Sequence, residues 1–335
     1  MRGRLEHKIK TENNIQNKIQ DMPDYIHRFY YSLNQKSHTT KNRYIDNVIR
    51  FLRWKYGDDF PDRKELDKIE SYDIQVFMSE ISYYDKHGET QELKGTTQGV
   101  IYASLSTFFS FLNRYYRTEN NPFNSKLIER PTIRENDVVY LTPEEVKRVE
   151  SEILSGTGNQ ISVSKQSDWK YRDMLLFRLP VVNGLRVTAL DEINVEDINL
   201  ANRTIKVTEK RNITKYVDFD KKTGEYLNKW LRQRREILGA EVKTEKALFI
   251  SNRRSRMTVR AIQKVVDKYT KCIEGKHITP HKLRSTCGTN TYQATGDIYL
   301  VANVLGHKTT APTRRYAAVL DTDKRNAINK VAALY

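Results

Sequence analysis

The sequence predicts a mainly α fold with a small β-meander, that is, an α+β protein built from two domains. The chain has 335 residues, more than a single compact core usually serves. In residues 21–120, apolar side chains recur at helical spacing throughout. In the second half, helical segments alternate with short runs rich in β-branched residues. These observations favour a helical domain followed by a mixed domain.

The first domain is expected at residues 21–120, after a polar segment at residues 1–20. We expect that segment to be flexible, or to be a helix that orders only on a partner. Residues 121–138 should form a polar linker, because Asn121 and Pro122 end the last helix. The predicted helices, which share an aromatic-rich core, are Met22–Leu33, Thr39–Tyr56, a segment that Ser71 caps, and a segment that begins near Thr96 or Thr97.

The second domain is expected at residues 139–335 and opens on a strong helix start. Thr142 can act as the N-cap, Pro143 suits the first helical position, and Glu145 closes a capping box. The other predicted elements are a flexible loop at residues 155–168, helices at Tyr171–Val182 and Thr223–Leu238, meander strands at Ile193–Ile198, Thr204–Thr208 and Lys215–Phe219, a short strand at Leu248–Ile250, and a final helix that Asp321 or Thr322 caps.

The charge balance favours a polyanionic partner. Lysine and arginine number 58 against 42 acidic residues, which gives a net charge of +16 and a sequence pI of about 9.6. A surplus of this size must lie mostly on the surface, and nucleic acid is the commonest polyanion that such a surface binds. A basic protein without any polyanionic partner is the alternative.

The N-terminus is polar and lacks the apolar stretch of a secretion signal. No apolar run approaches the roughly 20 residues that a membrane span requires. Cys272 and Cys287 form no CxxC motif or Cys/His cluster, so we expect reduced, buried thiols and no zinc. We therefore expect a soluble, cytoplasmic, nucleoid-associated protein without a membrane partner.

Four short motifs carry residues that suit phosphate chemistry. Each alone is weak, because most such arginines are surface residues, most turn lysines are solvated, a lone histidine is more often structural, and the chain has 20 tyrosines. Their order and spacing strengthen the signal. The motifs are Asn183-Gly184-Leu185-Arg186, Lys210 in the turn between two predicted strands, His281-Lys282-Leu283-Arg284 with its histidine and arginine on one helical face, and Leu305-Gly306-His307 followed nine positions later by Tyr316.

This ordered set resembles the tyrosine recombinases, also called the phage-integrase family, and is nearest to its Xer-type, XerS-like members. Members carry a TGLR-like arginine motif, a lysine in a β-hairpin, an HxLR motif, and LGH followed by a nucleophilic tyrosine. The resemblance covers residues 140–335 and extends to the helical first domain. It implies a SAM-like core-binding domain that binds DNA, followed by a tyrosine-recombinase catalytic domain.

The residue types explain the expected chemistry. Two guanidiniums, Arg186 and Arg284, can hold the oxygens of a phosphodiester and stabilise the charge that develops during attack. Tyr316 is the expected nucleophile, and His281 can accept its proton or hydrogen-bond the phosphate. His307 can add a further hydrogen bond. By resemblance, Lys210 protonates the departing 5′ oxygen.

The resemblance implies a site-specific DNA recombinase that works through a 3′-phosphotyrosine and a Holliday junction. Such an enzyme retains the phosphoester energy, so we expect no ATP, metal or other cofactor. It implies double-stranded DNA with specific core sites as the partner, and a homotetramer on two sites. The C-terminal helix is expected to dock in trans, with packing in cis as the alternative. Resolution of chromosome or plasmid dimers and integration or excision of a mobile element are both compatible with the sequence.

Six cations of the first domain are candidate DNA-backbone contacts, although a solvated helix face is an equal alternative for each: Lys36, Lys41, Arg43, Arg50, Lys94 and Arg114. The second domain departs from the family at Ala189, where many relatives carry an acidic residue. Asp191 and Glu192 are acidic but should point elsewhere on the helix. Ser285 stands where relatives often have histidine.

Two other functions are kept open. A type IB topoisomerase uses similar residues to nick and reseal one strand, although the helical first domain argues against it. A DNA-binding accessory protein without catalysis is the second alternative, which the intact reacting set opposes.

Overall fold

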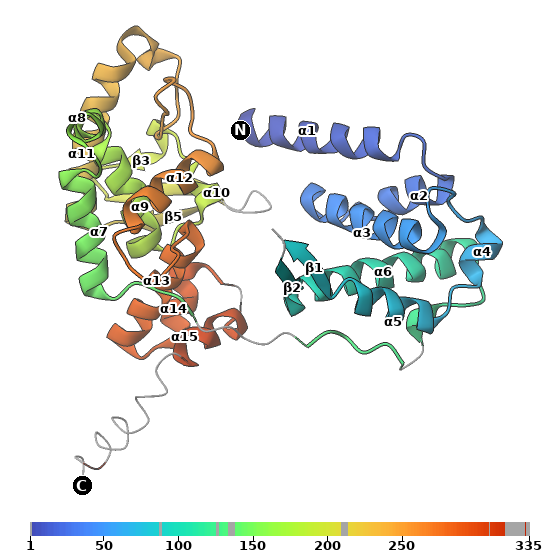
Figure 1. Ribbon diagram of the computed structural model, residues 1–335. Helices are drawn as coiled ribbons and strands as arrows, with labels where there is room; N and C mark the ends of the chain where they lie inside the picture. Colours follow the sequence, from blue (N-terminus) through green and yellow to red (C-terminus); the bar gives the residue numbers. More distant parts are fainter. Residues whose placement is uncertain are drawn as a thin grey trace. The chain divides into compact units, whose positions relative to one another are not determined.

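The computed structural model describes residues 2–86, 89–124, 127–132, 138–208, 214–307, 309–318 and 332 (Figure 1). The chain divides into two compact units, Met1–Asn136 and Asp137–Tyr335. The division falls within the segment 121–138 that we expected to be a linker. Among the described residues, no helix is both long enough and apolar enough to cross a membrane.

The first unit is helical, with one short antiparallel hairpin that the sequence analysis did not predict. The predicted helices at 22–33 and 39–56 are confirmed within a few residues, as is the one near Thr96. Helices α3 and α6 pack together, and α1 packs on α3. The elements are α1 Arg2–Ile19, α2 Asp24–Ser32, α3 His38–Tyr56, α4 Arg63–Asp67, α5 Ser71–Glu80, strands β1 Tyr83–Lys86 and β2 Glu89–Glu92, α6 Gly95–Tyr116, and a 3-10 turn at Pro122–Asn124.

Aromatic side chains fill the core of this unit, as predicted. Phe29 meets Phe108 edge-on with ring centroids 5.1 Å apart, and Phe51 meets Phe77 in the same manner at 5.2 Å. All four rings are fully buried. Offset and edge-on aromatic contacts add to the free energy gained by burial, so they stabilise the packing of α2, α3, α5 and α6.

Two expectations for the first unit were wrong. Residues 2–19 form helix α1 rather than a flexible segment, and Ile15 and Ile19 are fully buried in the core of the same chain. Burial of these two side chains explains why a helix of such polar composition is stable. The N-cap of α5 is Glu70, not Ser71. The Glu70 backbone N–H donates to the Asp73 carboxylate at 2.9 Å, and the Ser71 hydroxyl instead donates to the Pro122 carbonyl at 2.7 Å.

The second unit joins nine helices, counted in its described part, to a three-stranded antiparallel sheet of order β3-β4-β5 (Figure 1). The helices are α7 Pro143–Ser155, α8 Gln160–Ser167, α9 Lys170–Asn183, α10 Val187–Leu190, α11 Lys221–Leu238, α12 Val259–Thr270, α13 Pro280–Thr295, α14 Ile298–Leu305 and α15 Arg314–Ala318. The strands are β3 Ile198–Asn199, β4 Thr204–Thr208 and β5 Thr214–Asp218, and 3-10 turns lie at Val195–Asp197, Gly239–Lys243 and Ala311–Thr313.

The central helix of this unit is α9, in which 11 of the 14 residues are buried. Helices α7, α11, α12 and α13 pack around it (Figure 1). The predicted capping box of α7 is confirmed: the Glu145 backbone N–H donates to the Thr142 hydroxyl at 3.3 Å, and the Thr142 N–H donates to the Glu145 carboxylate at 2.8 Å. Because α9 is enclosed, the turn that follows it is held rigidly within the domain.

The meander has the predicted strand order, with one strand shorter than expected. Strand β4 has the predicted bounds, and Ile205 pairs with Val217 of β5. Of the predicted strand 193–198 only Ile198 lies in β3, because residues 195–197 form a 3-10 turn, and β3 extends one residue beyond the prediction to Asn199. Lys210, which follows β4 in the sequence, lies outside the described residues, as does the predicted final helix that Asp321 or Thr322 would cap.

Two further local predictions were wrong. The expected loop at 155–168 contains helix α8, which Asn159 caps by accepting a hydrogen bond from the Ser162 N–H at 2.9 Å. The expected strand at 248–250 forms only an isolated bridge between Ile250 and Arg256. Helix α8 buries none of its residues, so the local cap at Asn159 was a signal that the prediction missed. Leu248 and Phe249, by contrast, are buried, and their backbone groups bond to Ile193 and Met257.

Candidate active site

The guanidinium of Arg284 joins three of the sequence motifs. Pro280 and His281 open helix α13, and Arg284 follows on the same helical face, as predicted. The Arg284 side chain is buried, and its two terminal nitrogens donate hydrogen bonds to the carbonyl oxygens of Gly184 and Leu305. The motif at 183–186, helix α13 and the motif at 305–307 therefore meet at one side chain.

Two glycines allow this close approach. Gly184 ends α9 with φ +62°, and a Cβ there would lie 2.6 Å from Leu305 Cδ2. A Cβ on Gly288 would lie 2.8 Å from Cε2 of Tyr316 and 3.0 Å from Leu305. Such distances are shorter than real Cβ contacts, so only glycine fits without a shift of its neighbours. Helix α13 consequently packs directly against the ring of Tyr316.

His281 is exposed at the start of α13, yet cations surround it. Its pKa is lowered from the usual 6.5, first because partial desolvation disfavours the charged ring and then because of nearby positive charges. These charges belong to Arg315, Arg284, Lys282 and Arg186, in order of decreasing effect. Both predicted phosphate-binding arginines thus lie close enough to act on this imidazole, which is neutral at pH 7.

Arg186 is half-buried and is the N-cap residue of α10. The acidic residue expected in that helix is replaced by Ala189, whose methyl group is buried. The backbone carbonyls of Asp191 and Ile193, just beyond α10, accept hydrogen bonds from Nη1 of Arg256 at 2.5 and 3.3 Å. The main chain after α10 is therefore held by the Arg256 guanidinium, and next to it the Asp197 carboxylate accepts a hydrogen bond of 2.9 Å from the Asn194 N–H. At the other departure from the family, the hydroxyl of Ser285 donates to the His281 carbonyl at 3.2 Å.

His307 follows Gly306, which ends α14 in the left-handed conformation. The Nδ1 atom of His307 forms a hydrogen bond of 2.9 Å with the hydroxyl of Thr313, in the 3-10 turn that leads into α15. This bond fixes the orientation of the imidazole and ties the 305–307 motif to the helix that carries Tyr316. The sequence analysis did not identify Thr313.

The ring of Tyr316 is buried in a small apolar cluster with Cys287, Val301 and Leu305. Its hydroxyl accepts a hydrogen bond of 2.8 Å from Nη2 of Arg315. The Arg315 guanidinium also lies over the ring, with Cζ 4.9 Å from the centroid. Burial raises the pKa of the adjacent Cys287 thiol to about 11, which keeps it uncharged at neutral pH.

Arg315 was not predicted from the sequence, and Asn183 was assigned no role although it begins the first motif. The side-chain amide of Asn183 donates to the carbonyl of Asp218 at 2.5 Å, at the end of β5. This bond connects the Arg186 turn to strand β5. The adjacency of Arg315 to Tyr316 was visible in the sequence, but its contact with the phenol required the structure.

Comparison with known proteins agrees with this arrangement. Residues 142–323 match the phage integrase family. The chain belongs to this family. It is thus a tyrosine recombinase, an enzyme that recombines DNA at specific sites by cleaving and rejoining strands, and its curated relatives are of the Xer type.

Two of those relatives align with nearly all of the recombinase. Tyrosine recombinase XerC of Caldanaerobacter subterraneus subsp. tengcongensis is 29% identical over 90% of this chain and 84% of its own length. Tyrosine recombinase XerS of Streptococcus sanguinis is 24% identical over 92% of this chain and 96% of its own. The predicted Xer-type resemblance is confirmed by these matches.

Solved structures share the fold of the recombinase. The XerH recombinase bound to palindromic difH substrate has a TM-score of 0.72 at 19% identity and covers 95% of this chain and 88% of its own. A lambda integrase dimer bound to a COC′ core site has a TM-score of 0.63 at 18% identity and covers 87% of this chain and 93% of its own. The predicted α+β fold with a small meander is confirmed.

The six predicted DNA-contact cations of the recombinase lie in two environments. Arg43, Arg50, Lys94 and Arg114 are exposed. Lys36 and Lys41 are half-buried, with their amino groups 5.1 Å and 4.7 Å from the ring centroids of Tyr44 and Tyr30. Arg50 also lines a hollow of about 430 Å³ between α1 and α3, together with Arg53 and the Lys18–Asp46 ion pair. The exposed cations are the better candidates for phosphate contact.

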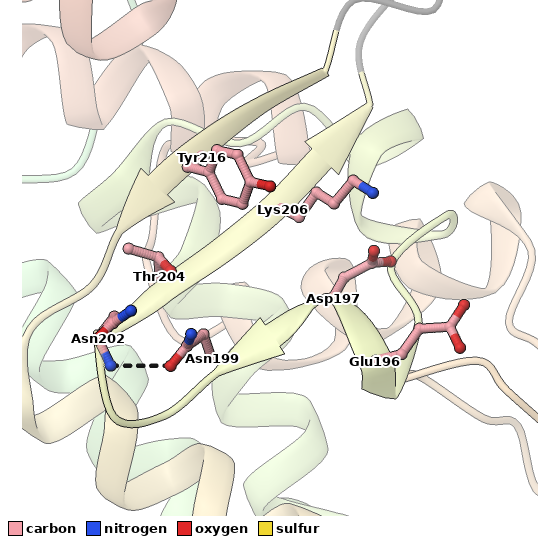
Figure 2. A pocket seen from close by; sticks show the side chains of 7 residues that line it. All are labelled: Glu196, Asp197, Asn199, Asn202, Thr204, Lys206 and Tyr216. Atoms are coloured by element: carbon pink, nitrogen blue, oxygen red, sulfur yellow. Dashed lines mark hydrogen bonds between the residues drawn. The ribbon is translucent and has the colours of Figure 1, made fainter.

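A second hollow, of about 540 Å³, opens on the exposed face of the sheet (Figure 2). Lys206 and Tyr216 are cross-strand partners there, and the Asn202 N–H donates to the Asn199 side chain at 2.9 Å. Asp197 also lines this hollow, but its carboxylate already accepts the Asn194 N–H at 2.9 Å. No predicted catalytic residue of the described chain lines this hollow, so it is distinct from the candidate active site.

Proposed function

We propose that this recombinase cleaves DNA by forming a covalent 3′-phosphotyrosine at Tyr316. The single observation that carries the proposal is the pair of hydrogen bonds from Arg284, which gathers the motifs of residues 183–186, 281–284 and 305–307 around one buried guanidinium. Helix α13, which carries Arg284, also packs on the ring of Tyr316 at Gly288. The nucleophile and the phosphate-binding groups thereby share one neighbourhood.

Arg186 and Arg284 bind the non-bridging oxygens of the scissile phosphate in this mechanism. Both guanidiniums remain charged at any physiological pH, and their planar donors match the phosphate oxygens. The closeness of both to His281 supports a shared phosphate site. Their positive charge stabilises the transition state more than the ground state, because negative charge concentrates on the equatorial oxygens during attack.

Proton transfer uses His281 and Lys210. Neutral His281 accepts the phenol proton as the oxygen of Tyr316 attacks phosphorus, and the lowered pKa of His281 keeps it available as a base. The bond from phosphorus to the 5′ oxygen breaks, and Lys210 gives that oxygen a proton. His307, oriented by Thr313, donates a further hydrogen bond to the phosphate. Attack by a partner 5′ hydroxyl then rejoins the strand.

Complete recombination requires an assembly on DNA. We propose that double-stranded DNA with specific core sites is the partner, that four copies act on two sites, and that exchange proceeds through a Holliday junction. The solved relatives support DNA binding, since XerH is bound to difH and lambda integrase to a core site. Docking of the C-terminal helix in trans belongs to the same proposal, and a nucleoid-associated, cytoplasmic location follows from the substrate.

Xer-type relatives favour resolution of chromosome or plasmid dimers over integration of a mobile element. A plasmid that carries two copies of the host chromosome's candidate site tests this role. Resolution to monomers in cells, and its loss with Tyr316→Phe, are expected. Recombination that requires an element-borne site instead would contradict the dimer-resolution role.

A suicide duplex, nicked next to the cleavage position, tests the nucleophile. We expect Tyr316→Phe to abolish the covalent protein–DNA adduct while DNA binding, measured by gel shift, persists. Tyr292→Phe is the matched control, because Tyr292 packs against the same apolar cluster. An adduct formed by Tyr316→Phe would show that another residue attacks. No adduct from any variant on cognate DNA would favour an accessory binding protein.

A second experiment tests whether Lys210 is the general acid. We expect Lys210→Ala to slow adduct formation on an ordinary duplex. A substrate with sulfur at the 5′ bridging position has a leaving group that needs no proton, so it should restore the rate. An unchanged defect on the sulfur substrate would remove Lys210 as the general acid.

A further inference from the structure

We propose that Arg315 is a further catalytic residue, which binds the phenol oxygen of Tyr316 and stabilises the negative charge on that oxygen as it attacks the phosphate. This role depends on Tyr316 being the nucleophile, as proposed above. None of the four sequence motifs includes Arg315, and it is distinct from Arg186 and Arg284, which are assigned to the phosphate.

The contact with the reacting atom is direct. Nη2 of Arg315 donates to the Tyr316 hydroxyl at 2.8 Å, and its Cζ lies 4.9 Å from the ring centroid. A donor that carries a full positive charge favours the phenolate over the phenol. The ring itself is buried, so water screens this interaction less than it would at an exposed tyrosine.

The guanidinium of Arg315 also carries a donor, Nε, that the contact with the phenol does not use. Its Nε atom is buried, yet within the described part of the chain it has no hydrogen-bond partner. A buried N–H without an acceptor is costly, and such groups mark places where a ligand supplies the acceptor. When the phenol oxygen attacks, the non-bridging oxygens of the scissile phosphate come next to it. One guanidinium can therefore contact both the nucleophile and the phosphate.

The positive charge of Arg315 also acts on His281, the proposed base. Its charge is the largest single electrostatic influence on His281, and it acts to keep that imidazole neutral. A neutral imidazole can take the phenol proton, whereas an imidazolium cannot. Arg315 thus favours both partners of the proton transfer, the acceptor before the step and the phenolate during it.

The chemical step remains balanced with this addition. The phenol proton moves to His281, the Tyr316 oxygen forms a bond to phosphorus, and the bond from phosphorus to the 5′ oxygen breaks. Lys210 supplies the proton for the departing oxygen. Arg315 keeps all its protons throughout and acts only by hydrogen bonding and charge, so no additional reactant is required.

The opposite role for the same contact is inhibition of cleavage. If Arg315 only held the phenol in a buried resting position, its removal would release the nucleophile and accelerate cleavage. The unpartnered Nε and the closeness to His281 favour catalysis instead. The sign of the change in rate decides between the two.

The test is the first-order rate of adduct formation on a suicide duplex at saturating full-length protein. Arg315→Gln is expected to slow this rate by about 10- to 100-fold at neutral pH, the range for a lost charge-assisted hydrogen bond. Arg314→Gln removes the same charge from the exposed neighbouring residue and should stay within about twofold.

A sulfur leaving group distinguishes Arg315 from Lys210. Arg315→Gln should remain slow on the 5′-bridging sulfur substrate, because the defect concerns the nucleophile. A normal or faster rate for Arg315→Gln, or its rescue by sulfur, would overturn the inference. If Arg315→Gln fails to fold by circular dichroism, Arg315→Lys decides, since lysine keeps the charge but lacks the planar fork. Arg315→Lys should then be slower than wild type, and an unchanged rate would overturn the inference.

An adduct formed by Tyr316→Phe would instead contradict the proposed function itself. Wild-type behaviour of Arg315→Gln beside an inactive Tyr316→Phe would contradict the role of Arg315 alone. The two failures are therefore distinguishable.

Discussion

At the scale of single residues, the candidate site depends on charges held within a protein interior. Arg284 is buried and is paired with two main-chain carbonyls, which are neutral. A guanidinium keeps its positive charge at any physiological pH, so Arg284 can attract a phosphate. Arg315 donates to the hydroxyl of Tyr316. Both arginines therefore contribute positive charge to a site for an anionic substrate.

His281 gives a prediction about pH. Because desolvation and four cations lower its pKa, its protonation midpoint should lie below 6.5 in the folded protein. The imidazole accepts protons only when neutral, so the acid limb of adduct formation should also fall below pH 6.5. Arg315→Gln removes the largest charge effect and should move the midpoint upward. NMR titration of the His281 ring measures this, and a midpoint above 6.5 in the wild type would contradict it.

Gly288 gives a prediction about packing. In Gly288→Ala, the new methyl group would lie 2.8 Å from the Tyr316 ring, so the ring or α13 must move. Overpacking of this kind costs about 1–3 kcal/mol of unfolding free energy, and the displaced phenol should slow adduct formation at least about tenfold. Gly224→Ala, in α11, is the control, because its nearest neighbour is a Phe219 ring carbon at 3.2 Å. Equal adduct rates for the two variants would refute the role of Gly288.

At the scale of elements, helix α9 positions the site. It is enclosed by α7, α11, α12 and α13, so its C-terminal turn, with Gly184 and Arg186, has little freedom. Polar contacts hold α9 as well as apolar ones. Arg178 binds Glu150 of α7 and also Asp220, at 3.1 Å, and Lys222 approaches Glu150 at 2.7 Å. This network, in which Arg178 and Glu150 are buried, links α9 to α7 and to the start of α11.

Removal of one member of this network should destabilise the catalytic domain. In Glu150→Ala, the buried guanidinium of Arg178 loses its closest carboxylate, which we expect to cost about 3 kcal/mol of unfolding free energy. Glu225→Ala, at an exposed position of α11, should cost less than about 0.5 kcal/mol. Urea denaturation followed by circular dichroism measures both. A Glu150→Ala protein as stable as Glu225→Ala would mean that the network contributes little.

Element boundaries show where local signals suffice. The start of α7 was predictable because Thr142, Pro143 and Glu145 satisfy the first backbone donors from neighbouring residues. The burial of Ile15 and Ile19, which stabilises α1, depends on a core formed by residues far along the chain. Likewise, the backbone partners of the segment 247–250 lie at residues 193–194 and 256–257, which the local sequence does not indicate. A complete capping box such as that of α7 is therefore predictable from the sequence, whereas the caps at Glu70 and Asn159 were missed and tertiary burial was not predictable.

At the scale of the whole molecule, net charge and the two-unit organisation bear on DNA binding. A charge of +16 favours association with a polyanion, and exposed cations occur in the helical unit at Arg43, Arg50, Lys94 and Arg114. Arg43 and Arg50 are seven residues apart on α3, so they share a face two helical turns long. Such a face can follow the phosphates of one strand.

Salt dependence tests this surface. Each phosphate contact contributes about −0.9 to the slope of log K against log salt. We expect Arg43→Gln and Arg50→Gln each to reduce the magnitude of that slope by about 1. Lys64→Gln, an exposed cation of α4, is the control and should leave the slope unchanged. Fluorescence anisotropy over a range of salt concentrations gives the slopes, and identical slopes for all three variants would show that α3 does not contact the backbone.

The sequence by itself determined the two-part organisation, most helix positions, the order of the strands and the ordered motif set from Arg186 to Tyr316. Periodicity, capping and motif spacing are local properties, so they can be read without coordinates. Only the tertiary structure decided that Arg284 binds Gly184 and Leu305, that Gly288 faces the Tyr316 ring, and that Arg315 reaches the phenol. The hydrogen bonds of Arg284 join segments that are 21 and 100 residues apart in the chain. The contact of Gly288 depends on close packing between helices, and the contact of Arg315 depends on the direction of its side chain. Neither chain separation nor residue type specifies those distances, because the packing of the whole domain sets them.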